Sequence, residues 1–182
     1  MNETDLYKLK FPIGEFKKPD SIQNDLIHKW IDDIEKFPIT IERLTKNLSL
    51  QQLQWSYRPE GWTIKQVVHH CADSHMNSII RFKLALTEDT PTIRPYFESR
   101  WANLIDGTDD NLSATQSLLN GLHAKLGKLL RHIPKEDLSR TFVHPEHGKQ
   151  FTLDETIGIY AWHCNHHLAH IKLALEHKGK FN

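Results

Sequence analysis

The stretch TIKQVVHHCADSHMNSIIRFKLAL, residues 63–86, is the strongest indication of the fold in this sequence. Thr63 and Gln66 have the spacing of a capping box, in which the two side chains bond each other's backbone N–H groups at the start of a helix. Apolar residues then recur every three or four positions, as they do on the buried face of a helix. This stretch therefore predicts one long amphipathic helix with a well-defined beginning.

Upstream of this stretch, the sequence predicts an N-terminal arm and a second helix. Residues 1–19 contain two prolines and a glycine without helical periodicity, so we expect them to form an extended arm. Asp20 or Ser21 can cap the helix that follows, in which isoleucines recur at helical spacing. Pro38 lies within that pattern, and it is expected to kink or break the helix.

Downstream, the sequence predicts a long connection and a third helix. Residues 87–111 hold prolines, a glycine and an acidic pair, so we expect a long crossover. Trp101, Leu104 and Ile105 are apolar, which suggests that part of the crossover packs onto the rest of the molecule. Leucines at helical spacing then predict a helix over about 113–132.

The C-terminal part predicts a hairpin and a fourth helix. In residues 140–151, Pro145 and Gly148 flank a turn between two short segments, a pattern typical of a β-hairpin. Thr152 and Glu155 repeat the capping-box spacing and open a helix from 153 to about 177. We therefore expect residues 1–182 to form a single all-α domain, a four-helix bundle with a long crossover and a small β-hairpin before the last helix.

Composition excludes several classes of function. Lys plus Arg equal Asp plus Glu at 23 each, so the chain has no net charge that would attract nucleic acid or an anionic membrane. No apolar run is long enough to span a bilayer, and the first residues lack the apolar core of a signal peptide. We therefore expect a cytoplasmic protein in which Cys71 and Cys164 are free thiols.

Histidine is the unusual residue, with thirteen in 182 positions. The segment WHCNHHLAH, residues 162–170, places four imidazoles at spacings of three, one and three, on one broad helical face. His163 and His167 lie one turn apart, close enough to bind the same ion. A single pair of this kind is a weak signal, whereas four histidines on one face strengthen the prediction of a metal site.

A third ligand must come from the helix over 63–86, and the polar residues of that helix favour His70. It lies on a stripe whose other members are Gln66, Asp73, Ser74, Asn77 and Arg81. A polar stripe on a helix that is otherwise apolar suggests an internal polar cavity. His69 lies about 100° away around the helix axis and should be more peripheral.

The remaining histidines have a simpler interpretation. Most histidines outside sites are core residues that bond backbone carbonyls or members of a solvated face, and we expect this for His28, His75, His123, His132, His144, His147 and His177. Arg81 has two equally good interpretations from the sequence. It can contact a substrate, or it can pair with Asp73 two turns earlier.

At these residues the sequence resembles a known family. GWTIKQVVHHCADSHMNSIIRFKLALTEDTPTIRPY (61–96), YAWHCNHHLAHI (160–171) and PIGEF (12–16) are similar to the YfiT branch of the DinB/YfiT superfamily. That branch holds predicted metal-dependent hydrolases and includes bacillithiol S-transferases. The resemblance extends along nearly the whole chain and implies a DinB-type four-helix bundle that often forms a homodimer.

The resemblance also implies a set of ligands. The family's three metal-binding histidines fall on His70, His163 and His167, with zinc as the usual metal and nickel as an alternative. The sequence departs from the family pattern beside these ligands. Cys71 stands where an aliphatic residue is expected, and Cys164 with Asn165 replaces Ser-His.

Three histidine ligands would leave a coordination position open, which is typical of a catalytic rather than a structural metal site. Such an ion can activate water or a thiol. A hydrolase is therefore one interpretation, a transferase of a low-molecular-weight thiol such as bacillithiol is a second, and a non-catalytic metal-binding or stress-associated module is a third. We expect a small-molecule substrate, with Asp73 and His166 as candidates for proton transfer and Asn77 and Arg81 for substrate contact.

Overall fold

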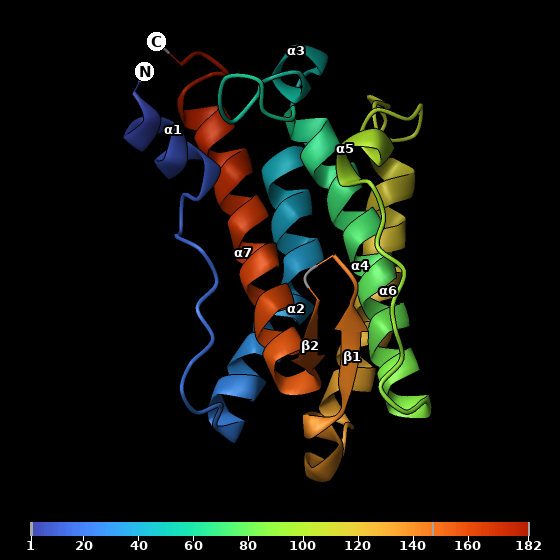
Figure 1. Ribbon diagram of the computed structural model, residues 1–182. Helices are drawn as coiled ribbons and strands as arrows, with labels where there is room; N and C mark the ends of the chain where they lie inside the picture. The colour runs from blue at the N-terminus through green and yellow to red at the C-terminus, as the bar shows by residue number, and fades with distance from the viewer. Residues whose placement is uncertain (1, 147, 182) are drawn as a thin grey trace.

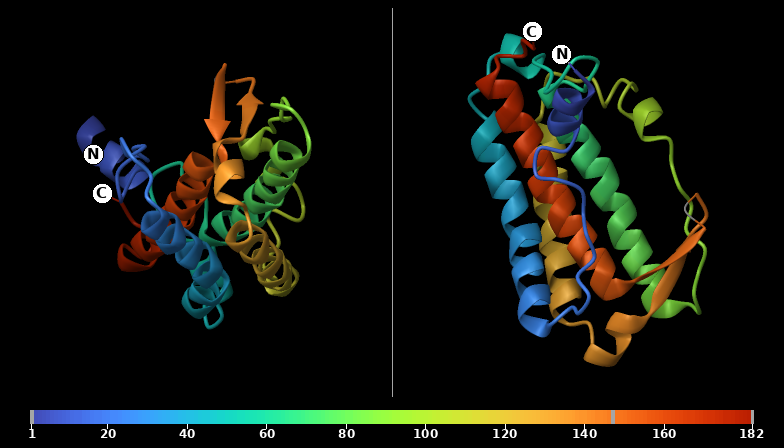
Figure 2. Two further views of the ribbon diagram at one scale, coloured as in Figure 1. Left: turned by 90° about the horizontal axis from the view of Figure 1, so that it is seen from below. Right: turned by 60° about the vertical axis from the view of Figure 1, so that its left-hand side comes forward.

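The computed structural model describes residues 2–146 and 148–181, and four long helices run side by side along its length (Figures 1 and 2). These helices are α2 (Asn24–Thr45), α4 (Ile64–Thr87), α6 (Ser113–Arg131) and α7 (Leu153–Glu176). The neighbouring pairs are α2–α7, α7–α4, α4–α6 and α6–α2, so α2 and α4 lie on one diagonal of the bundle. The predicted four-helix bundle is confirmed.

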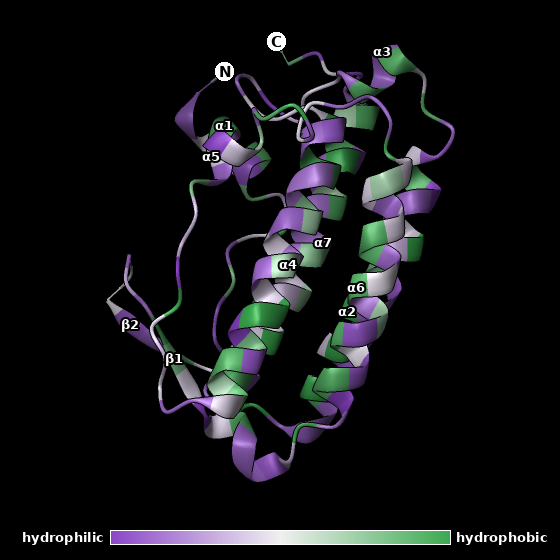
Figure 3. Cartoon of the chain, turned by 90° about the vertical axis from the view of Figure 1, so that its right-hand side faces the viewer, coloured by the Kyte–Doolittle hydropathy of each residue, from purple (hydrophilic) through white to green (hydrophobic). Residues whose placement is uncertain are grey.

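A hydrophobic core fills the space between the four helices. Each helix carries apolar residues in bands that alternate with polar ones (Figure 3), and the apolar bands meet at the bundle axis. The fully buried large side chains include Ile34 and Phe37 of α2, Phe82 of α4 and Ile171 of α7. This packing holds α4 and α7 in contact along the region where both carry histidines.

The beginning of α4 is as the sequence predicts. The hydroxyl of Thr63 accepts from the backbone N–H of Gln66, and the side chain of Gln66 accepts from the backbone N–H of Thr63 at 3.1 Å. Helix α7 begins at Leu153 as predicted, but the predicted capping box is absent, because Thr152 makes no side-chain capping bond. Glu155 instead accepts from Lys18 at 2.8 Å and Lys149 at 3.1 Å, so its carboxylate is not available to the helix end.

The N-terminal residues differ from the expected extended arm. Helix α1 (Glu3–Lys10) is stabilised by the side chain of Asn2, which accepts from the backbone N–H of Asp5, and by acidic residues in its first turn and basic residues in its last. The prediction is therefore wrong for these residues. The segment that follows does lie extended along α7, where Trp162 donates to the carbonyl of Gly14 at 3.0 Å (Figure 2).

Helix α2 begins later than expected, with Gln23 as its N-cap, and it continues through Pro38. The expectation of a break at Pro38 is wrong. Proline removes the hydrogen bond that residue 38 would donate to the carbonyl of Ile34, and Nδ1 of His123 in α6 lies 2.7 Å from that carbonyl and replaces the missing donor. Gln116 of α6 also donates to the carbonyl of the buried Pro38 at 2.9 Å. Tertiary packing thus keeps the helix continuous.

The connections contain short elements. These are α3 (Leu50–Leu53), α5 (Glu98–Trp101), the 3₁₀ helix η1 (Lys135–Ser139), and the strands β1 (Thr141–His144) and β2 (Lys149–Thr152). The strands pair antiparallel with Phe142 opposite Phe151, which confirms the hairpin. The crossover also bonds to β1, since the backbone N–H of Ile93 donates to the carbonyl of Val143 at 3.0 Å.

Part of the crossover packs onto the rest of the molecule, as expected, because Ile93 and Ala102 are buried. Leu104 and Ile105 do not contribute to this packing, since both are exposed, the latter at 89% of its surface. Trp101 packs on Tyr96 with ring centroids 4.5 Å apart. Within residues 2–146 and 148–181, no helix has the length and apolar character needed to cross a membrane.

Candidate metal centre

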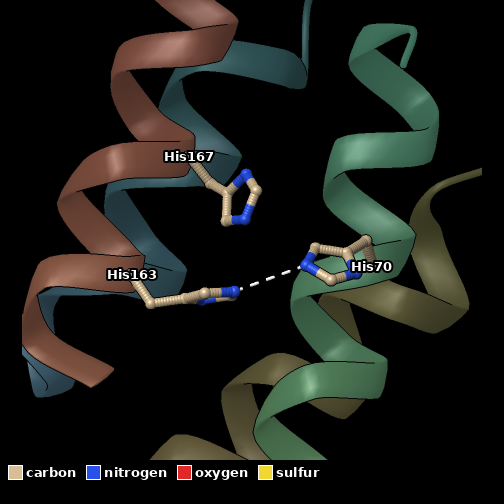
Figure 4. Close-up of side chains that lie close together, drawn as sticks. All are labelled: His70, His163 and His167. Carbon is tan, nitrogen blue, oxygen red and sulfur yellow. Dashed lines mark hydrogen bonds between the residues drawn. The ribbon is translucent and has the colours of Figure 1, made fainter. Parts of the chain in front are cut away.

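Three histidines from α4 and α7 meet between these helices (Figure 4). His70 comes from α4, while His163 and His167 come from successive turns of α7. One ring nitrogen from each residue lies within 4.8 Å of the other two. The structure thus brings together these three residues, the histidine trio, which the sequence predicts as metal ligands.

The spacing of these nitrogens fits a divalent ion. Nε2 of His70 and Nε2 of His163 are 3.3 Å apart. Two nitrogens that each lie about 2.0–2.1 Å from a tetrahedral zinc ion are about 3.3–3.4 Å apart. The chemistry of three imidazoles suits zinc or nickel, and it leaves room for at least one further ligand.

The surroundings keep these histidines neutral, as a metal ligand must be. Burial lowers the pKa of His70 to about 4, and it lowers the pKa values of His163 and His167 well below the usual value. His70 also packs against the indole of Trp62, with ring centroids 4.6 Å apart. All three rings are thus ready to donate a lone pair at neutral pH.

His69, the neighbour of His70, faces another direction. Its Nδ1 lies 2.7 Å from the hydroxyl of Thr115 in α6, and its Nε2 lies 3.0 Å from the carbonyl of Asp109. Both nitrogens are occupied by partners outside the trio. The structure therefore places His69 at the α4–α6 contact and His70 at the α4–α7 contact.

A second layer of histidines surrounds the trio, and the sequence did not predict its role. Nε2 of His75 is 3.1 Å from Nδ1 of His163, and Nδ1 of His75 is 2.8 Å from Nε2 of His123. Nδ1 of His170 is 3.4 Å from Nδ1 of His167. His75 lies about 140° around the helix from His70, so a search for residues on the same face misses it.

His123 could have been placed in the core from spacing alone. It shares a buried stripe with Leu119, four residues before it, and with Leu126 and Leu130, three and seven residues after it. His75 and His123 are indeed buried and hydrogen-bonded, as expected of core histidines. Their contact with the candidate ligands, however, follows only from how α2, α4, α6 and α7 pack.

A second group of histidines could also hold an ion. His166, His167 and His170 each present a nitrogen within 4.8 Å of the others, and all three are buried. His167 belongs to both groups. His170 also bonds the carbonyl of Lys10 at 3.1 Å through Nε2, which ties this group to α1.

A cavity of about 650 Å³ lies beside the trio, and His163 forms part of its wall. The cavity runs between α4, α7, the crossover and the hairpin. Its wall is largely aromatic, with charged groups among the rings; it includes Phe16, Arg81, Tyr96, Glu98, Lys149, Phe151, Tyr160 and Trp162. A cavity of this size and character can enclose a small molecule.

Of the four residues expected to act on substrate or protons, Arg81 alone among the described residues lines this cavity. Arg81 donates to the hydroxyl of Tyr160 at 3.1 Å, so its bond is to α7 rather than to Asp73. Asn77 donates to the backbone carbonyl of Asp73 at 2.9 Å, which commits its amide to its own helix.

The other two predicted residues lie further around the site. Burial, together with the charge of Asp106, raises the pKa of Asp73 to about 6. His166 stacks on Trp162 with ring centroids 4.4 Å apart and faces Phe11. Burial lowers the pKa of His166 to about 4.

Cys71 and Cys164 are free and buried, as predicted. Burial raises the pKa values of both thiols well above the usual value, so they are protonated at neutral pH. The sulfur of Cys164 lies 3.9 Å from Nε2 of His75.

Two other predicted core or surface histidines have partners outside the site. His28 bonds Arg131, and His132 bonds the carbonyl of Lys128. The prediction for His147 falls outside the described residues.

The pattern of the DinB superfamily matches residues 35–171, most of the chain and all three histidines of the trio. The chain therefore belongs to the DinB superfamily. Within it, the chain is similar to a solved structure, YfiT from Bacillus subtilis, with a TM-score of 0.91 and 42% identity over 96% of this chain and 99% of the other. That protein is described as a probable metal-dependent hydrolase with an unusual four-helix bundle topology.

Curated relatives give the same result. A protein of Oceanobacillus iheyensis is 48% identical over 89% of this chain and 93% of its own length. YfiT of Bacillus subtilis is 45% identical over 90% of this chain and 92% of its own length. Each bears the name "Putative metal-dependent hydrolase".

Proposed function

We propose that this protein is a metal-dependent hydrolase in which His70, His163 and His167 hold one divalent ion. The observation that carries the proposal is the 3.3 Å distance between Nε2 of His70 and Nε2 of His163, with His167 in reach of both. Two neutral imidazoles that aim nitrogens at each other at this distance suit a shared ion. The names of the relatives support the same activity.

When bound, the ion would supply an electrophilic centre that lowers the pKa of water or of a thiol. The protein contributes the shape and charge of the cavity. His163 joins the ion site to the cavity, and the guanidinium of Arg81 lies near enough to lower the pKa of His163 by its charge. We propose Arg81 as the contact for an anionic or strongly polar group of the substrate.

Proton transfer needs a group that changes its charge near neutral pH, and Asp73 has this property. Its raised pKa of about 6 places it closer to neutrality than an ordinary carboxyl group. We propose Asp73 as the group that takes up a proton, and His166 as a polar group behind His167. The amide of Asn77 donates to the backbone of its own helix, so we do not propose it as a substrate contact.

The preferred metal is zinc, with nickel as the alternative, because both accept three imidazole ligands. We propose a small-molecule substrate, in line with the enclosed cavity of about 650 Å³. A low-molecular-weight thiol as co-substrate, a cytoplasmic location and a homodimeric assembly remain parts of the proposal that rest on family resemblance and composition.

The test compares purified protein loaded with zinc or nickel against a His70→Ala variant. Both are assayed on ester, amide and phosphoester substrates, with and without a low-molecular-weight thiol. Hydrolysis that needs the metal and His70 but no thiol supports the proposal. Loss of an electrophile such as monobromobimane only when thiol is present would replace hydrolysis by thiol transfer. Inactivity in both assays, with metal bound, would favour a non-catalytic metal-binding protein.

A further inference from the structure

Each candidate ligand on α7 has a second ring nitrogen in contact with another buried histidine. His163 meets His75 in this way, and His167 meets His170. We propose that His75, backed by His123, and His170 are positioning residues that hold both ligands with the proton on Nδ1 and the lone pair on Nε2. The inference rests on the proposed metal site, because a defined lone pair matters only where an ion binds.

The first chain of hydrogen bonds runs from the carbonyl of Ile34 through His123 and His75 to His163. The direction of each bond follows from the end at Ile34. Nδ1 of His123 lies 2.7 Å from the carbonyl oxygen of Ile34. A carbonyl only accepts, so this nitrogen carries the proton, and Nε2 of a neutral His123 must accept. His75 therefore donates to it through Nδ1 at 2.8 Å and accepts through its own Nε2.

The last hydrogen bond of this chain joins His75 to the candidate ligand His163. Because Nε2 of His75 accepts, Nδ1 of His163 must donate to it across 3.1 Å. The thiol of Cys164, 3.9 Å from the same nitrogen of His75, is also placed to donate to it. Nε2 of His163 is left with a lone pair, and this is the nitrogen that faces His70.

Pro38 explains why the carbonyl of Ile34 is available. In a regular helix the backbone N–H of residue 38 would donate to the carbonyl of residue 34, and proline has no N–H. Helix α2 nevertheless continues through this position. The proline that should have broken the helix therefore leaves an acceptor for His123.

The second chain is shorter and ends on α1. Nε2 of His170 lies 3.1 Å from the carbonyl oxygen of Lys10, so this nitrogen carries the proton and Nδ1 accepts. Nδ1 of His167 must then donate to Nδ1 of His170 across 3.4 Å. The ring of Tyr57 stacks on His170 at 3.7 Å between centroids and fixes its plane.

A second ion at His166, His167 and His170 would conflict with this arrangement. His167 would have to give a lone pair from Nδ1 to that ion and another from Nε2 to the first, which requires loss of the one ring proton that a neutral imidazole carries. A hydrogen bond to His170 needs no such loss. The backbone carbonyls of Ile34 and Lys10 thus define the protonation pattern of both ligands.

The decisive experiment is NMR of the metal-free full-length protein with ¹⁵N-labelled histidine, which reports which ring nitrogen of each histidine carries the proton. We expect the proton on Nδ1 of His123, His75, His163 and His167, and on Nε2 of His170. A proton on Nε2 of His163 or His167 would overturn the inference. Titration with zinc should then give one ion per chain, and two ions per chain would overturn the assignment for His167.

Metal affinity tests the same idea through variants. Loss of a partner of this kind typically weakens metal binding about 10–100-fold, and we expect this for His75→Phe in competition with a chromophoric chelator. His75→Gln keeps an acceptor for His163 and should recover part of the affinity. His69→Gln is the matched control, because His69 is a buried histidine of the same helix whose bonds lead to Thr115 and Asp109.

Equal affinity of the His75→Phe variant and the native protein would overturn the inference. If a variant fails to fold, the NMR experiment on the native protein still decides the question. The two proposals also fail in different ways. Native protein with the expected protonation pattern but no bound metal would refute the proposed function alone, whereas bound metal with the reversed pattern would refute the positioning role alone.

Discussion

Helices α4 and α7 begin with the same sequence pattern and carry most of the histidines, yet the structure uses them differently. Gln66 of α4 completes its capping box, while Glu155 of α7 turns to Lys18 and Lys149. Both residues suit the pattern, but only the carboxylate is attracted by two lysines from distant parts of the chain. The difference shows that a local motif holds only where no stronger partner competes for its side chains.

The histidines of the two helices show the same contrast. On α7, the two candidate ligands lie on one face, as spacing predicts. On α4, His69 faces the contact with α6, His70 belongs to the trio, and His75 joins His163 to the buried His123. Adjacent histidines on α4 therefore have different partners, because adjacent positions on a helix face directions about 100° apart.

The largest effect is expected from the ligands of the two helices. His70→Ala on α4 and His163→Ala on α7 should each abolish stoichiometric metal binding, since two imidazoles hold a divalent ion much more weakly than three. Elemental analysis after dialysis measures this. His69→Ala is the control on α4 and should keep its metal, and an unchanged metal content in His70→Ala would refute the site.

Acid should next destabilise the metal-free protein through the buried histidines. Their pKa values are lowered in the folded state, to about 4 for His70 and His123, while the unfolded values stay near 6.5. The unfolded state thus takes up protons first, and stability that is present above pH 6.5 is lost as the pH falls toward 4. We expect a loss on the order of 1 kcal/mol per pH unit for each such histidine.

Urea unfolding at pH 7.5, 6.0 and 5.0 measures this loss. Ordinary carboxyl groups titrate near pH 4, so the interval above pH 5 reports mainly on histidine. A free energy of unfolding that stays constant over this interval would contradict the prediction. Saturating zinc should increase the difference between pH 7.5 and 5.0, because protons compete with the ion for the same nitrogens.

Substitution of the N-cap threonines of α4 and α7 should change the free energy of unfolding by a smaller amount. Thr63→Ala should cost about 1 kcal/mol of stability, because it removes a working N-cap. Thr152→Ala should cost under about 0.5 kcal/mol, because Thr152 makes no capping bond. Denaturant unfolding of both variants at pH 7.5 makes the comparison, and equal losses would mean that α7 is capped as α4 is.

The smallest effect is expected from Asp73, because its side chain is only half-buried and solvent screens its charge. Its pKa is raised in the folded state to about 6, so its ionisation opposes folding as the pH rises from about 4 to 6. Asp73→Asn removes this opposing contribution and should make the protein slightly more stable at pH 7.5 but not at pH 4. The urea midpoints of the variant and the native protein at these two values test the sign, and a variant less stable at pH 7.5 would contradict it.

The sequence by itself determined the four long helices, the hairpin and the three candidate ligands. Helical periodicity placed the long helices to within a few residues, the spacing of His163 and His167 placed both on one face, and the polar stripe of α4 selected His70. These inferences succeed because they depend on positions within one helix, where geometry is regular.

Only the tertiary structure decided how the remaining groups are used. Contacts between distant segments keep α2 continuous through Pro38 and direct Glu155 to lysines instead of to its own helix end. They also create the chain of hydrogen bonds from Ile34 through His123 and His75. No periodicity encodes such contacts, because a hydrogen bond between helices is set by how the helices pack. The sequence thus identified the candidate ligands, and only the packing of α1, α2, α4, α6 and α7 decided which groups contact them.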